Sequence, residues 1–494
     1  MTYDGHPLYS AAQTRELDRQ AIERLTVPGY ELMCRAAAVT WDALRARRPD
    51  ARSLDIVCGS GNNGGDGYAL ARLAHSAGWH VRVWSLGDPR PGTEAAQALA
   101  DCHASVAPRA YESGCLRDAA IVVDAIYGTG LSRAPQGLAA AAIEDIRALS
   151  GRAWIVAIDV PSGLSADTGQ APGVVVKADL SVSFIGRKLG VYTGSGPDLC
   201  GERVFDALAL PHNAEVDASA VLLDRAMLAR RLPPRARGAH KGSSGIVTLI
   251  GGDDGYAGAI LLAARATLRC GAGLVSVATR QAHAAGLVPA QPEVMFRAVE
   301  SAGDLAPLIA RSRVLAVGPG LGQNDWGRAM WQAALSAGKP LVVDADALNL
   351  LAQVPRFRDD WILTPHPGEA ARLLGCDVAQ VERDRYAAAR ELSQRYGGVV
   401  VLKGAGTVIA GARTSVCPYG NPGMAVGGMG DALTGVIAAL FAQGLSLMDA
   451  AETGVMVHAL AGDAAARKGE RGLLPSDVID ALRAVVNPRM EPWP

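Results

Sequence analysis

Short apolar runs alternate with longer amphipathic stretches along the first half of the chain. The runs cover residues 54–58, 81–84, 121–126, 154–159 and 180–184. After the first run, apolar residues recur at helical spacing on one face and Gly78 follows as a stop signal; they are Leu70, Leu73, Ala74 and Ala77. Buried strands separated by helices predict parallel β-α-β units with right-handed crossovers.

The same alternation restarts after a break near the middle of the chain. Strand-like runs cover residues 246–250, 274–277, 314–317, 341–343 and 399–402, and a helix is expected over residues 257–270. The break lies between residues 217 and 237, where Pro233 and Pro234 can neither continue a helix nor pair in a central strand. The flanking charges favour solvent; they are Arg230, Arg231, Arg235 and Arg237. The sequence therefore predicts two domains, residues 1–217 and residues 222–494.

Composition agrees with a layered α/β protein. At 494 residues the chain is too long for one hydrophobic core, and its 49% hydrophobic content can fill two or three. Glycine is abundant, at 57 residues, whereas aromatic residues make up only 5%. Because small residues let helices pack closely on a sheet, this balance favours helices layered on sheets.

Charge and targeting signals point to a cytoplasmic protein. A net charge of −1 supplies no basic field for a nucleic-acid partner. The first residues lack the basic start and apolar segment of a signal peptide. Residues 432–442, the longest apolar stretch, are too short to cross a bilayer, so no membrane association is expected. The eight cysteines occur singly, without a CxxC pair, which predicts neither a zinc site nor a disulfide framework.

A glycine-rich segment at residues 59–67 joins the first strand to the first helix. Its five glycines let backbone N–H groups turn inward, and the start of the following helix favours an anion. Asn62, Asn63 and Asp66 add side-chain oxygens. The alternative is a turn that only caps the helix, but a cap does not need these polar insertions.

Two acidic residues end neighbouring predicted strands in the same half. Asp124 precedes a second glycine-rich loop, and Asp159 precedes Pro161 and Ser162. A buried carboxylate is costly unless it is paired, hydrogen-bonded or bound to a metal, so two of them facing an Asn-rich loop predict an oxygen-lined site. Such ligands suit a hard cation rather than zinc. Lys188, after a later strand, is either part of this site or a surface charge.

The strongest chemical signal lies at residues 421–431, before an apolar helix. Its glycines gather backbone N–H groups and a helix N-terminus at one point, which predicts an anion hole, and Asp431 sits in the first helical turn. Alone, Asp431 is an ordinary N-terminal helix residue, but the glycine cluster exceeds what capping needs. Residues 403–407, between two apparent strands, are by themselves a hairpin turn; beside Asp431 they indicate a nucleotide-phosphate contact.

The first half resembles the NAD(P)H-hydrate epimerase domain over about residues 10–215, on residues 59–67, Asp124 with its loop, residues 159–163 and Lys188. The resemblance implies a K⁺ ion bound by Asn63, Asp124 and Ser162, with Asp159 as the acid/base. It also implies a substrate, a nicotinamide nucleotide hydrated at ring carbon 6, whose contacts are Asn62, Asn63, Gly64, Gly65, Asp66, Gly128, Thr129, Gly130, Leu131, Ser132, Arg133, Ala134, Asp159 and Lys188.

The second half resembles ribokinase-like enzymes at Asp431 and, more specifically, the ADP-dependent NAD(P)H-hydrate dehydratase family over about residues 222–490. The shared motifs are residues 240–242, 251–259, 318–322, 344–349 and 364–369. The resemblance implies that the hydrate is contacted by Ala259, Gly322, His366 and Asp431. It implies that the nucleotide is contacted by Lys403, Gly404, Ala405, Gly406, Thr407 and Gly430.

By that resemblance Asp431 takes the proton of the substrate hydroxyl, which then receives the terminal phosphoryl group of ADP. Mg²⁺ would bridge the nucleotide phosphates. No cluster of carboxylates marks its ligands, and Asp346 and Glu369 are assigned only supporting roles.

The expected fold is α/β, with an amino-terminal Rossmann-like three-layer αβα domain and a ribokinase-like α/β domain. The expected function is repair: epimerisation of the hydrates NADHX and NADPHX, then dehydration of the S form with ADP, giving AMP and phosphate. Ala-rich helices permit packing into a homo-oligomer. One alternative is a ribokinase-like small-molecule kinase with a non-catalytic Rossmann-like domain, and another is a nucleotide-binding scaffold. An inert first domain should lack one of Asn63, Asp124, Asp159 or Ser162, and all four are present.

Overall fold

The computed structural model describes residues 5–116, 118–131, 133–210 and 216–488. The chain divides into two compact units, Pro7–Ala220 and Val221–Pro494, the latter grouped with Met1–His6. Residues 221–228, within the predicted break, belong to the second unit: Val221 and Leu222 pair with β19 (Thr414–Cys417), and Met227 and Leu228 of α7 (Met227–Arg231) enter its core.

The Pro7–Ala220 unit contains a seven-stranded sheet in the order β4-β3-β2-β5-β6-β7-β9, with every neighbouring pair parallel. Its strands are β2 (Ser53–Cys58), β3 (His80–Ser85), β4 (Arg109–Ala110), β5 (Ile121–Ala125), β6 (Trp154–Ile158), β7 (Leu180–Phe184) and β9 (Glu202–Asp206). Two further strands, β1 (Gly5–Tyr9) and β8 (Arg187–Lys188), pair in parallel. This order is the Rossmann arrangement, in which the direction of winding reverses between β2 and β5.

Helices cover both faces of that sheet. The helices of this unit are α1 (Ala11–Leu25), α2 (Gly29–Arg47), α3 (Asn62–Ser76), α4 (Glu94–His103), α5 (Gly137–Ala148), α6 (Gly196–Leu199) and the 3₁₀ helix η1 (Leu189–Val191). Val123 and Val156 pack in the core formed with α2, α3 and α4, whereas their neighbours Val122 and Ile155 pack in the core formed with α5. Because successive side chains of a strand point to opposite faces, the sheet is packed against helices on both sides, which gives the three predicted layers.

The face predicted for the first helix is only partly correct. Leu70 and Ala74 are fully buried, but Leu73 is partly exposed and Ala77 lies beyond the helix, which ends at Ser76. The helix is covered by both α2 and α4 as well as by the sheet. Its buried surface is therefore wider than one amphipathic stripe.

The second unit is built on a sheet in the order β13-β12-β11-β14-β15-β16-β17-β18-β19-β10. Neighbours are parallel from β13 to β17, antiparallel across β17-β18-β19, and parallel at β10. The strands are β10 (Ala220–Leu223), β11 (Ile246–Ile250), β12 (Leu274–Thr279), β13 (Met295–Ala298), β14 (Val314–Val317), β15 (Leu341–Val343), β16 (Trp361–Leu363), β17 (Val399–Leu402), β18 (Thr407–Ala410) and β19 (Thr414–Cys417).

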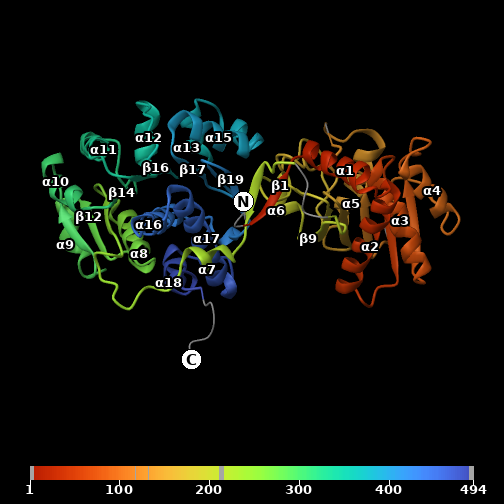
Figure 1. The fold of residues 1–494 in the computed structure, drawn as a ribbon, viewed down its shortest axis with the longest axis horizontal. Helices are drawn as coiled ribbons and strands as arrows, with labels where there is room; N and C mark the ends of the chain where they lie inside the picture. The colour runs from red at the N-terminus through yellow and green to blue at the C-terminus, as the bar shows by residue number, and fades with distance from the viewer. Residues whose placement is uncertain (1–4, 117, 132, 211–215, 489–494) are drawn as a thin grey trace. The chain divides into compact units, whose positions relative to one another are not determined.

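Four helices of this unit pack together beside the sheet: α8 (Ala257–Arg269), α16 (Met429–Ala442), α17 (Leu447–Ala465) and α18 (Pro475–Val485). Figure 1 shows α8, α16 and α18 as neighbours. The other helices are α7 (Met227–Arg231), α9 (Gln281–Leu287), α10 (Ala302–Arg311), α11 (Asp325–Ser336), α12 (Ala345–Gln353), α13 (Pro367–Leu374), α14 (Val378–Arg383), α15 (Arg385–Tyr396) and the 3₁₀ helices η2 (Pro422–Met424) and η3 (Ala466–Lys468). Among the described helices, none combines the length and apolarity that a bilayer crossing requires.

Candidate active sites

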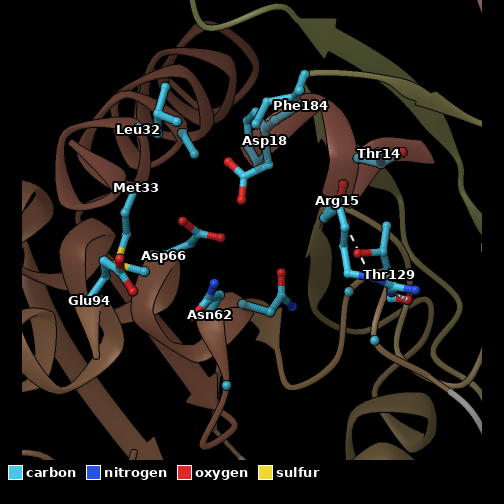
Figure 2. A pocket seen from close by; sticks show the side chains of 18 of the residues that line it. Thr14, Arg15, Asp18, Leu32, Met33, Asn62, Asp66, Glu94, Thr129 and Phe184 are labelled. Carbon is cyan, nitrogen blue, oxygen red and sulfur yellow. Dashed lines mark hydrogen bonds between the residues drawn. The ribbon is translucent and has the colours of Figure 1, made fainter. Parts of the chain in front are cut away.

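A cavity of about 500 Å³ opens in the first unit where the winding of the sheet reverses. The residues that follow β2 and β5 line it, together with residues from α1, α2 and the ends of β6 and β7. Eight predicted site residues lie in its wall: Asn62, Asn63, Asp66, Gly128, Thr129, Gly130, Asp159 and Lys188. Figure 2 shows Asn62, Asp66 and Thr129 around the cavity.

The glycine-rich motif contributes to this cavity differently from the prediction. Helix α3 begins at Asn62, inside the motif, so Gly64 and Gly67 are helical. A Cβ atom on Gly64 would lie 1.8 Å from the Gly59 carbonyl oxygen, and one on Gly67 would lie 2.7 Å from Ala125 Cβ. These glycines therefore let the helix pack tightly against the strand ends, while the start of the helix, rather than an open loop, meets the cavity.

Asp159 directly follows β6 in a left-handed backbone conformation, with φ of 68°. This region is sparsely populated by residues other than glycine, and such strain gathers at functional sites. Its carboxylate accepts hydrogen bonds from Lys188 Nζ, from Ser183 Oγ at 3.3 Å and from the Thr129 N–H at 3.3 Å. A Cβ atom on Gly128 would lie 2.8 Å from Asp159 Oδ2, so glycine lets the second loop approach the carboxylate.

Lys188 is buried, with 2% of its side chain exposed, and is not a surface charge. It forms an ion pair with Asp159 and also donates to the Phe184 carbonyl at 2.8 Å. A buried ammonium is tolerated only with such partners. The lysine therefore fixes the orientation of the Asp159 carboxylate at the cavity wall.

Asp124 and Ser162 meet behind the cavity. The carboxylate accepts hydrogen bonds from Ser162 Oγ at 2.6 Å and from the Ser162 N–H at 2.8 Å, and the Ser162 hydroxyl also accepts from the Tyr127 N–H at 2.8 Å. Burial raises the pKa of Asp124 to about 6, although the hydrogen bonds from Ser162 oppose this rise. A nearby cation would favour the ionised carboxylate.

Asn63 provides the observation that fits such a cation. Its amide Nδ2 is buried without a hydrogen-bond partner among the described residues, while its Oδ1 lies 3.2 Å from where a Cβ atom on Gly128 would be. Exchanging the amide nitrogen and oxygen would place an oxygen at the unpartnered position. Asn63, Asp124 and Ser162 would then present an all-oxygen set of ligands, which suits a hard cation.

The other predicted residues of this half lie away from the cavity lining. Gly64 and Gly65 pack inside α3, and Leu131, Arg133 and Ala134 follow the lining part of the second loop. Ser132 lies outside the described residues.

Sequence reasoning missed the contribution of α1, which supplies Thr14, Arg15 and Asp18 to the wall. In Figure 2 the carboxyl groups of Asp18 and Asp66 point toward each other. Burial and a neighbouring carboxylate raise the pKa of both: Glu94 acts on Asp18, and Asp159 acts on Asp66. Ser10 and Gln13 form a capping box that marked the start of α1, but nothing local showed which face it turns to the cavity.

In the second unit the Gly427–Gly430 region forms the N-terminus of α16. Gly428 precedes the helix with φ of 93°, and Asp431 is the third helical residue. A Cβ atom on Gly430 would lie 3.1 Å from Lys403 Nζ, so glycine lets the ammonium approach the start of the helix. Backbone N–H groups, the positive end of the helix and a lysine thus converge beside one carboxylate, as an anion-binding site requires.

Lys403 is the centre of a charged cluster behind this turn. Its Nζ donates to Asp344 Oδ1 at 2.8 Å and lies 3.8 Å from Glu369 Oε2, while Thr434 Oγ1 donates to Asp344 Oδ2 at 2.7 Å. Burial opposes ionisation of Asp344, but Lys403 and the hydrogen bonds outweigh it and hold the pKa of Asp344 below its usual value. Burial instead raises the pKa of Glu369 to about 7.

Asp431 has the properties of a proton acceptor. Burial and the neighbouring charge of Asp344 raise its pKa to about 6, while Lys403 opposes the rise and Asp346 adds to it. A carboxylate with a raised pKa is a stronger base than an exposed one and is still ionised at neutral pH.

His366, a predicted hydrate contact, is the N-cap of α13. Its Nδ1 accepts the N–H groups of Gly368 at 2.9 Å and Glu369 at 3.4 Å, and Glu369 accepts the His366 N–H in return. Since Nδ1 is an acceptor, the neutral ring carries its proton on Nε2. Burial and the charge of Lys403 lower its pKa, which favours the neutral ring.

The two remaining predicted hydrate contacts lie on facing segments. Ala259 is in α8, and its Cβ lies 3.4 Å from where a Cβ atom on Gly320 would be. Gly322, with φ of 70°, donates its N–H to Asp346 Oδ2 at 2.9 Å. The supporting role predicted for Asp346 thus takes the form of a backbone hydrogen bond. Over the described residues, no three His, Cys, Asp or Glu side chains are arranged to hold a metal ion.

Each half of the chain matches a known protein family. A family model described as NAD(P)H-hydrate dehydratase matches residues 247–484, and one described as YjeF-related protein N-terminus matches residues 29–190. A ribokinase-like superfamily protein from Enterococcus faecalis is 29% identical, with a TM-score of 0.52 over 56% of this chain and 98% of that chain. The second unit therefore has the predicted ribokinase-like fold.

Two curated relatives match along almost their whole length. The bifunctional NAD(P)H-hydrate repair enzyme of Coxiella burnetii is 47% identical over 97% of this chain and 99% of its own length. The enzyme of the same name from Escherichia coli is 43% identical over 98% of this chain and 95% of its own length. The chain belongs to the family of bifunctional NAD(P)H-hydrate repair enzymes.

Proposed function

We propose that the two units catalyse successive steps in the repair of NADHX and NADPHX. The first interconverts the R and S hydrates, and the second dehydrates the S hydrate with ADP, giving the reduced nucleotide, AMP and phosphate. The observation that carries this proposal is the pair of aspartates, Asp159 and Asp431, each held at a separate site by a lysine or by a helix N-terminus.

At the first site, Asp159 takes the proton from the hydroxyl group on ring carbon 6. As a carbonyl group forms at that carbon, its bond to the ring nitrogen breaks; the electron pair goes to the nitrogen, which takes up the proton. Attack of the nitrogen on the other face of the carbonyl group returns the proton and gives the opposite epimer. Lys188 holds the carboxylate in place and Thr129 donates its N–H to the same group. Positioning is the main requirement, since the deprotonated oxygen itself drives cleavage of the carbon–nitrogen bond.

Asn63, Asp124 and Ser162 would hold K⁺ beside this site. The bound ion would supply positive charge that orients an oxygen of the substrate. The unpartnered amide of Asn63 supports a cation at this place.

At the second site, Asp431 removes the proton from the substrate hydroxyl, whose oxygen attacks the terminal phosphorus of ADP. The N–H groups of the Gly427–Gly430 turn and Lys403 stabilise the charge on the transferred group. Phosphate then leaves from ring carbon 6 more easily than hydroxide would, and loss of a proton from the neighbouring ring carbon restores the dihydropyridine. Because no three His, Cys, Asp or Glu side chains of the described residues are arranged to hold a metal ion, Mg²⁺ would be held mainly by the phosphates of the nucleotide.

Product analysis separates this function from a simple kinase. Purified protein is incubated with S hydrate, ADP and Mg²⁺, and the products are measured by phosphate assay and mass spectrometry. Repair predicts equal amounts of free phosphate, AMP and reduced nucleotide. A stable phosphorylated hydrate that accumulates would refute the dehydratase assignment, and Asp431→Asn provides the inactive control.

A further inference from the structure

Arg385 is a buried arginine beneath the loop formed by residues 403–407. It is the first residue of α15, and only 2% of its surface is exposed. Removing a guanidinium from water is costly unless it is hydrogen-bonded, so its partners indicate what it is there to hold.

Two of those partners are backbone carbonyl groups at the end of β17. Arg385 Nη2 donates to the carbonyl oxygens of Leu402 at 3.2 Å and Lys403 at 3.0 Å. Nη1 donates to Glu382 Oε1 at 2.7 Å. The guanidinium thus ties the first residues of the loop to the start of α15.

Glycine at position 404 leaves room for the Arg385 guanidinium. It has φ of 141°, and a Cβ atom there would lie 2.8 Å from Arg385 Nη2. Its carbonyl oxygen accepts a hydrogen bond from Thr407 Oγ1 at 2.9 Å. Three successive carbonyl groups, those of residues 402, 403 and 404, are therefore bound by side chains of the protein itself.

This arrangement determines which polar groups the loop can offer to a ligand. Gly404 and Ala405 are exposed, and within the described part of the chain their N–H groups have no acceptor. Carbonyl oxygens repel a phosphate, whereas outward N–H groups bind it. A loop with its carbonyls fixed inward is suited to an anion.

We infer that Arg385 is a positioning residue for the nucleotide: it holds the carbonyls of Leu402 and Lys403 so that the N–H groups of Gly404 and Ala405 receive a phosphate of the nucleoside diphosphate. The inference rests on the proposed function, in which residues 403–407 contact ADP. It adds a residue that neither reacts nor touches the nucleotide but sets the affinity of the loop.

The test uses the full chain with Arg385→Lys and Arg385→Met. Affinity for ADP is measured by calorimetry, and KM for ADP and kcat are measured for dehydration of the S hydrate. Both variants should raise Kd and KM for ADP, by about tenfold or more for methionine, which loses the charge-assisted hydrogen bonds. Lysine should have a smaller effect because one ammonium replaces part of the contact. At saturating ADP, kcat should be nearly unchanged.

Two controls separate positioning from a general loss of stability. Arg231 is also buried but pairs with Glu452, so Arg231→Lys should leave the ADP affinity unchanged. Epimerisation at the other unit should be unchanged in every variant. If the Arg385 variants do not fold, Gly404→Ala, whose methyl group would press on the guanidinium, must weaken ADP binding in their place.

The outcomes are distinct. Folded Arg385 variants that bind ADP as tightly as the wild type would overturn the inference and leave the proposed function intact, as would normal ADP affinity in Gly404→Ala. Wild-type protein that does not bind ADP would overturn both. A fall in kcat alone, without a change in KM or Kd, would also contradict a role in holding the nucleotide.

Discussion

Lowering the pH from 7 to 5 should reduce dehydration about tenfold. The base must be ionised to accept a proton, and the pKa of Asp431 is about 6 because it is buried and lies near Asp344. With that value, roughly nine-tenths of the protein is active at pH 7 and roughly one-tenth at pH 5. Activity is therefore lost as the pH falls through 6 and reaches a plateau above 7.

The assay follows recovery of the absorbance of the reduced nicotinamide from purified S hydrate. The ratio kcat/KM is measured at each pH, because it reports the groups of the free enzyme. Recovery without enzyme is subtracted at each pH, since the hydrate itself is sensitive to acid. The use of S hydrate alone removes any contribution from the epimerase site.

One substitution should shift the midpoint of the pH–activity profile in a predictable direction. Asp346 raises the pKa of Asp431, and it accepts the Gly322 N–H at 2.9 Å, a bond that the amide oxygen of asparagine can also accept. Asp346→Asn should therefore shift the midpoint to lower pH with little loss of plateau activity. A profile that is flat between pH 5 and 7, or a midpoint that moves upward in this variant, would refute Asp431 as the base.

Three further outcomes are expected. Asp159→Asn should abolish epimerisation but leave dehydration of S hydrate intact, as measured with each pure epimer; loss of both in a folded variant would contradict independent sites. Gly67→Ala should destabilise the first unit by about 1–3 kcal/mol in denaturant unfolding, because the added methyl group would lie 2.7 Å from Ala125 Cβ. K⁺ at a hundred times its Kd should raise stability by about 2.7 kcal/mol over a bulky organic cation, and Asn63→Ala should remove that difference.

Much of the architecture could be predicted because the strands are short apolar runs with consistent flanking signals. The runs at 180–184, 246–250 and 314–317 coincide with β7, β11 and β14. The predicted ends of helices and loops were wrong where contacts with distant parts of the chain determine them. Residues 62–67 look like an open glycine loop, but they form the start of α3, where the strand ends behind Gly64 and Gly67 leave no room for a side chain.

The candidate sites were predictable where the chemistry is local and not where it depends on distant packing. Asp124 and Asp159 end apolar strands, so their cost of burial is visible in the sequence. The sequence did not show whether Lys188 is exposed or buried, because its burial depends on the ion pair with Asp159, 29 residues away. Asp18 of α1 reaches the cavity, and Arg385 reaches the nucleotide loop, only through the three-dimensional fold.

The central claim, two sites that act in sequence on one damaged cofactor, is tested most directly with an equilibrium mixture of both hydrate epimers. Purified protein is added with ADP, Mg²⁺ and K⁺, and recovery of the reduced nicotinamide is followed to completion. The account predicts complete and prompt recovery by the wild type, and recovery of only the S fraction by Asp159→Asn until slow spontaneous epimerisation supplies the rest. Wild-type recovery that stops at the S fraction would contradict the epimerase assignment, and no recovery at all would contradict the account as a whole.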